Sequence, residues 1–323
     1  MPKSPKPPAR GPLDLSRVKT YPLRTRRSKV RTSQFGSPWQ SGGTFAGFLA
    51  SLPDVLAVKT LRRLAKAIAH AHRRRRPVIF GLGAHPTKVG LNPILVDLMD
   101  RGIITAVAMS GAVVIHDFEL AYLGQTSEDV DAEIDNGRFG MAEETGRMIN
   151  EAIIQGDKEG QGIGEAVGRY MNRHAKAFRS IKTSLLAKAA TLNVPATVHV
   201  AIGTDIIHMH PLADGAALGA ASLYDFHKLT AVVSRMEGGV YVNVGSAVLL
   251  PEVFLKTVTL SRNLGRSLRH ITTANLDFLN QYRPTTNVLK RPTQKGGVGY
   301  ALTGHHEIML PLLAAAILEE LDS

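Results

Sequence analysis

The sequence of 323 residues contains no cysteine and no long apolar run. The absence of cysteine excludes disulfide bonds, thiolate zinc sites and thiol catalysis. No stretch reaches the roughly 18 consecutive apolar residues that a membrane-spanning helix requires, and the first 35 residues lack the apolar segment of a secretory signal. We therefore expect a cytoplasmic protein with no membrane-spanning segment.

Acidic residues are almost missing from the amino-terminal part of the chain. Residues 1–35 contain ten lysines and arginines but one acidic residue, Asp14, whereas the remaining 288 residues have a net charge of only +3. Residues 1–42 are rich in proline and show no apolar period. We predict a basic arm that is solvated, docks onto another subunit or makes a weak contact with a polyanion. Because most of the excess charge of +12 lies in this arm, the charge disfavours nucleic acid as the main partner. Residues 43–323 have the composition of one globular domain.

The domain shows an alternation of short apolar runs and helical patterns. The pattern predicts an α/β fold, a Rossmann-like parallel sheet of at least five strands with helices on both faces. It also predicts a helical insertion at about 125–190. The expected strands are 77–83, 103–109, 196–203, 239–245 and 268–278. The first expected helix ends at arginines 73–76. The others are expected at 91–101, 112–123, 141–154, 163–186, 216–236, 251–264 and 307–321.

Small residues follow several of these strands, at the sheet edge where open parallel sheets bind ligands. Such turns allow a phosphate to approach the backbone, and the helix that follows supplies free N–H groups. Three turns of this kind at one edge favour a dinucleotide, although each alone fits an ordinary tight turn. Asp277 is a candidate for a ribose hydroxyl, with a structural cap as the alternative. The candidate cofactor-binding residues are Gly83, His85, Thr87, Lys88, Ser110, Gly111, Gly245, Ser246, Asp277 and His305.

Polar side chains also follow the strand at 196–203. Asp205, His208 and His210 lie there, and His305 and His306 are further imidazoles. No spacing typical of a metal site is completed, so we predict no metal. We expect these side chains to make ordinary polar contacts within the chain, or Asp205 to bind the cationic group of an amine.

The order of motifs over most of residues 77–320 resembles the deoxyhypusine synthase family. The resemblance rests on Met-Ser-Gly-Ala-Val-Val-Ile-His-Asp-Phe at 109–118, Tyr-Leu-Gly at 122–124, Thr-Asp-Ile-Ile-His-Met-His at 204–210, Asn-Val-Gly-Ser-Ala-Val at 243–248, Ile-Thr-Thr-Ala-Asn at 271–275 and Leu-Pro-Leu-Leu at 310–313. It implies a Rossmann-like fold, a homotetramer, NAD as cofactor and transfer of an aminobutyl group from spermidine to a protein lysine.

The sequence departs from that family at several positions. The Trp-Gly-Lys motif of the catalytic lysine is not recognisable, and Lys290 lies nearest its place, followed by Lys295. A pair of glutamates is replaced by Ile115 and His116, and the Ser-Asn-rich cofactor loop by residues 84–90. These departures predict a substrate other than the usual hypusine target.

We predict an NAD-dependent enzyme that oxidises a C–N bond of an amine or polyamine to an imine and transfers the aminoalkyl group. In this scheme Asp205 binds the amine, Lys290 is the covalent amine and His116 is the general base. One alternative is a non-catalytic nucleotide-binding or regulatory protein. Another is a metal hydrolase that uses His208, His210, His305 and His306.

Overall fold

The computed structural model describes residues 11–322, and within them it contains one parallel sheet of six strands. The strands are β1 (Val78–Leu82), β2 (Ala106–Ser110), β3 (Ala196–His199), β4 (Val240–Val244), β5 (Thr272–Asp277) and β6 (Val298–Thr303). Their spatial order is β3-β2-β1-β4-β5-β6, so the order reverses between β1 and β4. This order confirms the predicted Rossmann-like α/β fold.

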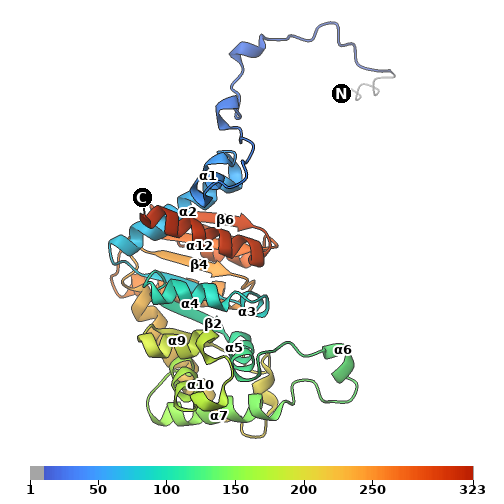
Figure 1. Ribbon diagram of the computed structural model, residues 1–323. Coiled ribbons are helices and arrows are strands. Elements are labelled where there is room, and N and C mark those ends of the chain that lie inside the picture. The colour runs from blue at the N-terminus through green and yellow to red at the C-terminus, as the bar shows by residue number, and fades with distance from the viewer. Residues whose placement is uncertain (1–10, 323) are drawn as a thin grey trace, which may run out of the picture.

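Helices cover both faces of the sheet (Figure 1). Val78, Phe80 and Leu82 of β1 contact the larger apolar core, and Ile79 contacts the smaller one on the opposite face. This alternation explains why the strands are apolar throughout, since both faces are buried. The larger core includes α2 (Leu56–Arg73), α4 (Asn92–Asp100) and α12 (His306–Asp322), and the smaller core includes α10 (Gly215–Val233) and α11 (Leu249–Asn263).

The segment predicted as one helix at 163–186 is two helices, α8 (Ile163–Arg173) and α9 (Leu185–Leu192). The prediction was wrong because Ser184 starts a new helix: its hydroxyl accepts a hydrogen bond from the backbone N–H of Ala187 at 3.0 Å. The other helices are α1 (Phe45–Ser51), α3 (His85–Lys88), α5 (Gly111–Leu123), α6 (Val130–Glu133) and α7 (Glu143–Lys158).

Strand β6 lies between the last predicted strand, 268–278, and the last predicted helix, 307–321, where the sequence pattern predicts no element. Gly297 and Gly299 interrupt its apolar pattern, and β6 pairs only with β5 at the edge of the sheet. A π-helical turn, Pro284–Lys290, precedes it.

Residues 11–42 form an arm that extends away from the domain (Figure 1). The arm contains two short 3₁₀ turns, Leu23–Thr25 and Thr32–Gln34. The predicted basic residues Lys3, Lys6 and Arg10 lie outside the described residues. None of the helices in residues 11–322 is long and apolar enough to cross a membrane.

Candidate functional site

A cavity of about 190 Å³ lies at the carboxyl ends of β1, β2 and β3. It brings together three predicted site residues that are far apart in the sequence: Lys88, His116 and Asp205. Lys88 ends the short helix after β1, His116 lies in α5 after β2, and Asp205 lies in the turn after β3. The other lining residues are Ala112, Ile115, Glu119, Ser127, Glu128, Val130, Phe139, Thr204 and Ile206.

The carboxylate of Asp205 lies against the first residue of α5. A Cβ atom at Gly111 would be only 2.0 Å from Asp205 Oδ2, so glycine at this position makes room for the carboxylate. Asp205 is 9% exposed, and its Oδ2 atom is buried without a hydrogen-bond partner. Burial raises the pKa of this carboxyl above its usual value. Such a group is stabilised by a cationic hydrogen-bond donor.

His116 is held in one tautomer by a chain of hydrogen bonds. The hydroxyl of Thr126 donates to Glu119 Oε2 at 2.5 Å, so its oxygen accepts from His116 Nδ1 at 2.7 Å. Nε2 is then the basic nitrogen of the neutral ring. Burial, followed by the nearby charge of Lys88, lowers the pKa of His116 to about 4. His116 is therefore neutral at pH 7.

Two further carboxylates line the cavity, and the sequence analysis did not single them out. Glu119 Oε1 accepts a hydrogen bond from the hydroxyl of Thr145 at 3.0 Å. Glu128 Oε2 accepts from the backbone N–H of Gly140 at 2.8 Å. Glu119 lies three residues after His116 in α5, a helical spacing that places both on one side of the helix. With Asp205, the cavity has three carboxylates against one lysine, which favours a cationic ligand.

Where the strand order reverses, between β1 and β4, the turns that follow the two strands pack closely against each other. A Cβ atom at Gly83 would be 2.0 Å from the carbonyl oxygen of Gly245. A Cβ atom at Gly245, which has a φ of +65°, would be 2.9 Å from the His306 ring and 3.3 Å from Pro86. These glycines allow the backbone to pack against itself. Beside these two glycines the described chain leaves no open space, and the dinucleotide stays a prediction.

Two imidazoles are coupled beside these turns. The carbonyl of Leu276 can only accept, so His306 Nε2 donates to it at 3.1 Å. Burial lowers the pKa of His306, so its ring is neutral. The Nδ1 atom of His306 then accepts a hydrogen bond from Nδ1 of His85 at 2.7 Å. The predicted residue His305 is exposed, with Nδ1 3.9 Å from a Glu307 carboxylate oxygen. It does not join this pair.

Of four other cofactor candidates, Ser246 and Asp277 have contacts within the chain, Thr87 is buried and Ser110 is partly buried. Ser246 accepts from the backbone N–H of Leu250 at 3.2 Å, at the start of α11. Asp277 accepts from the N–H of Phe278 at 2.8 Å, which fits the structural alternative. The hydroxyl of Thr87 is buried without a partner, and Ser110 is the residue before α5.

Lys290 is not brought to the cavity. It ends the π-helical turn, in which the carbonyl of Val288 accepts from the hydroxyl of Thr273 near the start of β5 at 2.8 Å. A Cβ atom at Gly299, near the start of β6, would be 2.4 Å from the carbonyl of Leu289. Lys290 therefore lies beside the amino-terminal ends of these strands, at the sheet edge opposite the cavity. The chain from 278 to 297 turns back along the sheet, which the spacing of the motifs did not reveal.

The histidines proposed for a metal hydrolase do not converge. His210 Nε2 is 3.4 Å from Glu143 Oε2, whereas His306 pairs with His85. No group of three or more metal-ligating side chains forms within residues 11–322.

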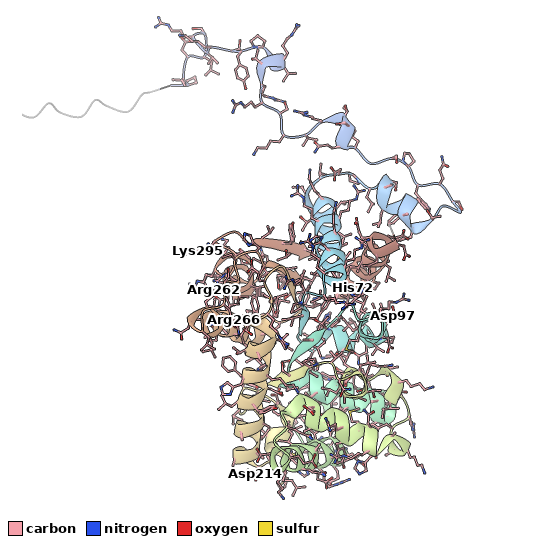
Figure 2. All side chains as sticks on the ribbon, turned by 90° about the vertical axis from the view of Figure 1, so that its left-hand side faces the viewer. His72, Asp97, Asp214, Arg262, Arg266 and Lys295 are labelled. Atoms are coloured by element: carbon pink, nitrogen blue, oxygen red, sulfur yellow. The ribbon has the colours of Figure 1, made fainter. Side chains whose placement is uncertain are left out.

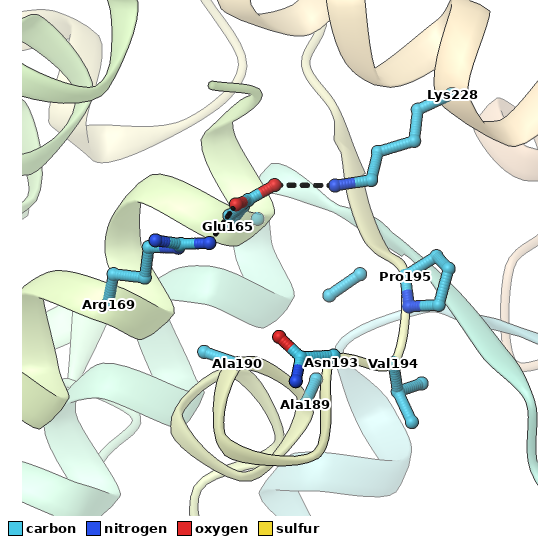
Figure 3. Close-up of a pocket in the computed structure, with 10 residues that line it drawn as sticks. Glu165, Arg169, Ala189, Ala190, Asn193, Val194, Pro195 and Lys228 are labelled. Atoms are coloured by element: carbon cyan, nitrogen blue, oxygen red, sulfur yellow. Dashed lines mark hydrogen bonds and ion pairs between the residues drawn. The ribbon is translucent and has the colours of Figure 1, made fainter. Parts of the chain in front are cut away.

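A smaller hollow of about 110 Å³ lies near the start of β3 (Figure 3). Glu165 forms ion pairs there with Lys228 at 2.6 Å and with Arg169 at 2.7 Å. Its carboxylate already has two cationic partners, so we regard this hollow as structural.

Comparisons with known proteins reveal the fold. No family model matches the chain. No curated protein matches it in sequence. An LOR/SDH protein of Methanococcus maripaludis S2 is similar in structure with 15% identity and a TM-score of 0.52, over 82% of this chain and 71% of that protein. A protein described as a deoxyhypusine synthase of Entamoeba histolytica has 11% identity and a TM-score of 0.51, over 88% and 96%.

AgrE, solved in complex with ornithine and NAD⁺, is a third structure of this fold. Its identity is 13% and its TM-score 0.51, and the match covers 83% of this chain but 34% of AgrE. This chain thus spans about a third of AgrE. At these identities the similarities establish the fold alone. Some of the proteins that share this fold are enzymes.

Proposed function

We propose that this protein is an enzyme that binds a small aliphatic amine or polyamine in the cavity of Asp205, His116 and Lys88. The observation that carries the proposal is the buried Asp205 Oδ2 atom, which has no partner in the described chain. An ammonium group would donate a charge-assisted hydrogen bond to it, a strong contact where water is excluded. Glu119 and Glu128 add negative charge on the same cavity wall.

The role of His116 in this cavity follows from its pKa. An alkylammonium has a pKa of roughly 10, like lysine, whereas the pKa of His116 is lowered to about 4. The difference prevents His116 from removing the ammonium proton to any useful extent. Its Nε2 atom instead accepts a hydrogen bond from the amine. The predicted general-base role then requires a substrate proton more acidic than that of an ammonium.

The position of Lys290 favours amine transfer without this residue as the covalent amine. It also supports a second candidate, a protein that binds an amine without turning it over. AgrE was solved with ornithine and NAD⁺, and we retain NAD-dependent oxidation as the reaction to test. We assign no residue of this chain to a nicotinamide step.

Isothermal titration calorimetry with putrescine and spermidine tests the proposal. Asp205→Asn should weaken binding about tenfold or more, because it removes the charge that pairs with the ammonium. Gly111→Ala should weaken it similarly, because the added methyl group displaces the carboxylate while alanine favours the helix. Asp214→Asn is the matched control: Asp214 is an exposed N-cap of α10, and asparagine preserves the cap (Figure 2).

Unchanged affinity in Asp205→Asn, or an equal loss in Asp214→Asn, would overturn the proposed amine site. Turnover is measured separately, as NADH formation from NAD and the same amines. NADH formation supports the redox enzyme, whereas tight amine binding without any product favours the binding protein.

A further inference from the structure

A second cavity, of about 350 Å³, lies at the opposite ends of the strands that carry the amine cavity. Pro77, Thr105 and Pro195 line it, and they directly precede β1, β2 and β3. These strands have four or five residues. At about 3.3 Å per residue, the two cavities are separated by roughly 15 Å of sheet. The second cavity is therefore a distinct site, and its volume lies within the range of small-molecule pockets.

Basic side chains from two helix ends form the wall of this cavity. His72 lies in the last turn of α2, Arg75 and Arg76 follow the end of α2, and Arg235 follows the end of α10. No acidic residue is among its lining residues within the described chain. The His72 ring is fixed by a hydrogen bond from Nδ1 to the carbonyl of Gly102 at 3.1 Å.

The negative ends of the nearby helix dipoles offset only part of this positive charge. The carboxyl ends of α2, α4 and α10 meet here, and each contributes roughly −0.5 of an elementary charge. The three guanidinium groups contribute +3, so about half of their charge is left uncompensated. Among residues 11–322, none of the ion pairs within 4.0 Å involves Arg75, Arg76 or Arg235.

Arg75 occupies a backbone position that normally favours glycine. Its φ is +53°, and the N–H of Arg76 donates to the carbonyl of Ala71 at 2.8 Å, as at the end of many helices. A residue with a side chain is strained in this left-handed conformation. The chain nevertheless places an arginine there, at the rim of a cavity that already contains two others.

We propose that this cavity binds a small phosphate-bearing anion with at least two negative charges. Guanidinium groups match the geometry of phosphoryl oxygens and donate paired hydrogen bonds to them. The apolar and backbone walls, Pro77, Gly102, Pro195 and Val232, limit the ligand to a small molecule. The site lies apart from the amine cavity and does not depend on the function proposed for it.

Titration calorimetry with inorganic pyrophosphate at low ionic strength tests this site. The wild-type chain should bind pyrophosphate, and Arg235→Gln should weaken binding about tenfold or more. Arg75→Gly should weaken it similarly and, because glycine relieves the left-handed strain, should raise the thermal unfolding midpoint. A loss of affinity together with a gain of stability separates loss of the site from misfolding.

Arg266→Gln serves as the matched control. Arg266 is an exposed arginine beyond the end of α11 and does not line the cavity (Figure 2). It should leave pyrophosphate affinity within about twofold of wild type, as expected for a screened distant charge. Failure of wild type to bind pyrophosphate, or an equal loss in Arg266→Gln, overturns the proposal. Binding of a single-stranded oligonucleotide without binding of pyrophosphate would also overturn it, in favour of an extended polyanion surface.

Discussion

Burial acts in opposite directions on the two ionisable residues that define the amine cavity. It raises the pKa of Asp205 and lowers that of His116, and in each case it disfavours the charged form. A bound cation would reverse the first effect, because it pairs with the carboxylate. It would strengthen the second, because a positive charge beside His116 opposes its protonation. Amine binding is therefore expected to leave both residues deprotonated, with the Asp205 carboxylate charged and the His116 ring neutral.

The low pKa of His116 predicts a dependence of stability on pH. Its folded pKa of about 4 lies below the ordinary value of 6.5, so the unfolded chain binds more protons between these values. The contribution to the unfolding free energy is complete above pH 6.5 and is lost as the pH falls toward 4. His116→Gln removes it. Between pH 7.5 and pH 5 the unfolding free energy of the variant should therefore fall less than that of the wild type. We expect a difference of about 1 kcal/mol, because solvent reaches the half-buried His116 and weakens the effect.

Urea denaturation of both proteins at several pH values measures this difference. His199 is buried, and its pKa is also lowered to about 4, so some acid sensitivity remains in the variant. Identical pH slopes in the two proteins would contradict the assignment of a neutral, buried His116.

At the level of single residues, the sequence predicted which residues lie close together better than it predicted what each residue does. Lys88, His116 and Asp205 each follow a strand, and parallel strands end at one edge, so their meeting was predictable. The role of Gly83 was not, because only the fold reveals that the Gly245 carbonyl fills the space beside it. Lys290 was assigned by its distance along the chain from other motifs, which does not determine the sheet edge.

At the level of elements, one buried carboxylate joins α5 to α9. Asp117 accepts hydrogen bonds from the hydroxyl of Ser184 at 2.7 Å and from the N–H groups of Leu185 at 2.8 Å and Leu186 at 3.1 Å. The amide of Asn92 also donates to it, at 2.8 Å. Burial outweighs these bonds and raises the pKa of Asp117 to about 6. Asp117 thus serves as the anchor for the start of α9 rather than as part of the cavity.

Asp117→Ala should destabilise the protein strongly, because it leaves several buried donors without an acceptor. We expect a loss on the order of 3 kcal/mol or more in unfolding free energy. Ser184→Ala is the comparison, since it removes the cap of α9 but keeps the carboxylate, and should cost about 1 kcal/mol. Urea denaturation at pH 8 measures both. Equal losses in the two variants would show that the cap, and not the network around Asp117, holds α9.

This contact also explains why the element boundaries were only partly predictable. The apolar spacing of 163–186 fits one helix, and the break depends on Asp117, which lies 67 residues before Ser184. Strand β6 was missed for a different reason, because its glycines and exposed residues carry no apolar alternation. Buried strands such as β1 and β4 were predicted within a few residues, since both faces of the sheet require apolar side chains there.

At the level of the whole molecule, basic charge is separated from acidic charge along the chain. The first 76 residues contain 18 of the 39 lysines and arginines but two of the 27 acidic residues. Within this region, the described part of the arm extends from the domain with its side chains in solvent (Figure 2). Its apolar residues are uncovered as well: Leu13 is 84% exposed and Leu23 is 70% exposed. The described part of the arm therefore contributes charge and exposed apolar surface, and little to the core.

A chain that begins at Gln34 should be as stable as the full chain. The truncation keeps the contacts that join this region to the domain, between Gln34 and Asp54 and between Ser37 and Ser51. Because the removed apolar side chains within the described arm are exposed, their loss removes no burial, and the unfolding free energy should change by less than about 0.5 kcal/mol. Urea denaturation at low and high protein concentration measures it.

If the arm docks onto a second copy of the chain, the full-length protein will unfold at a higher urea midpoint at high protein concentration, and the truncated protein will not. That result would contradict the expected independence of the arm and would support the oligomer predicted from the sequence.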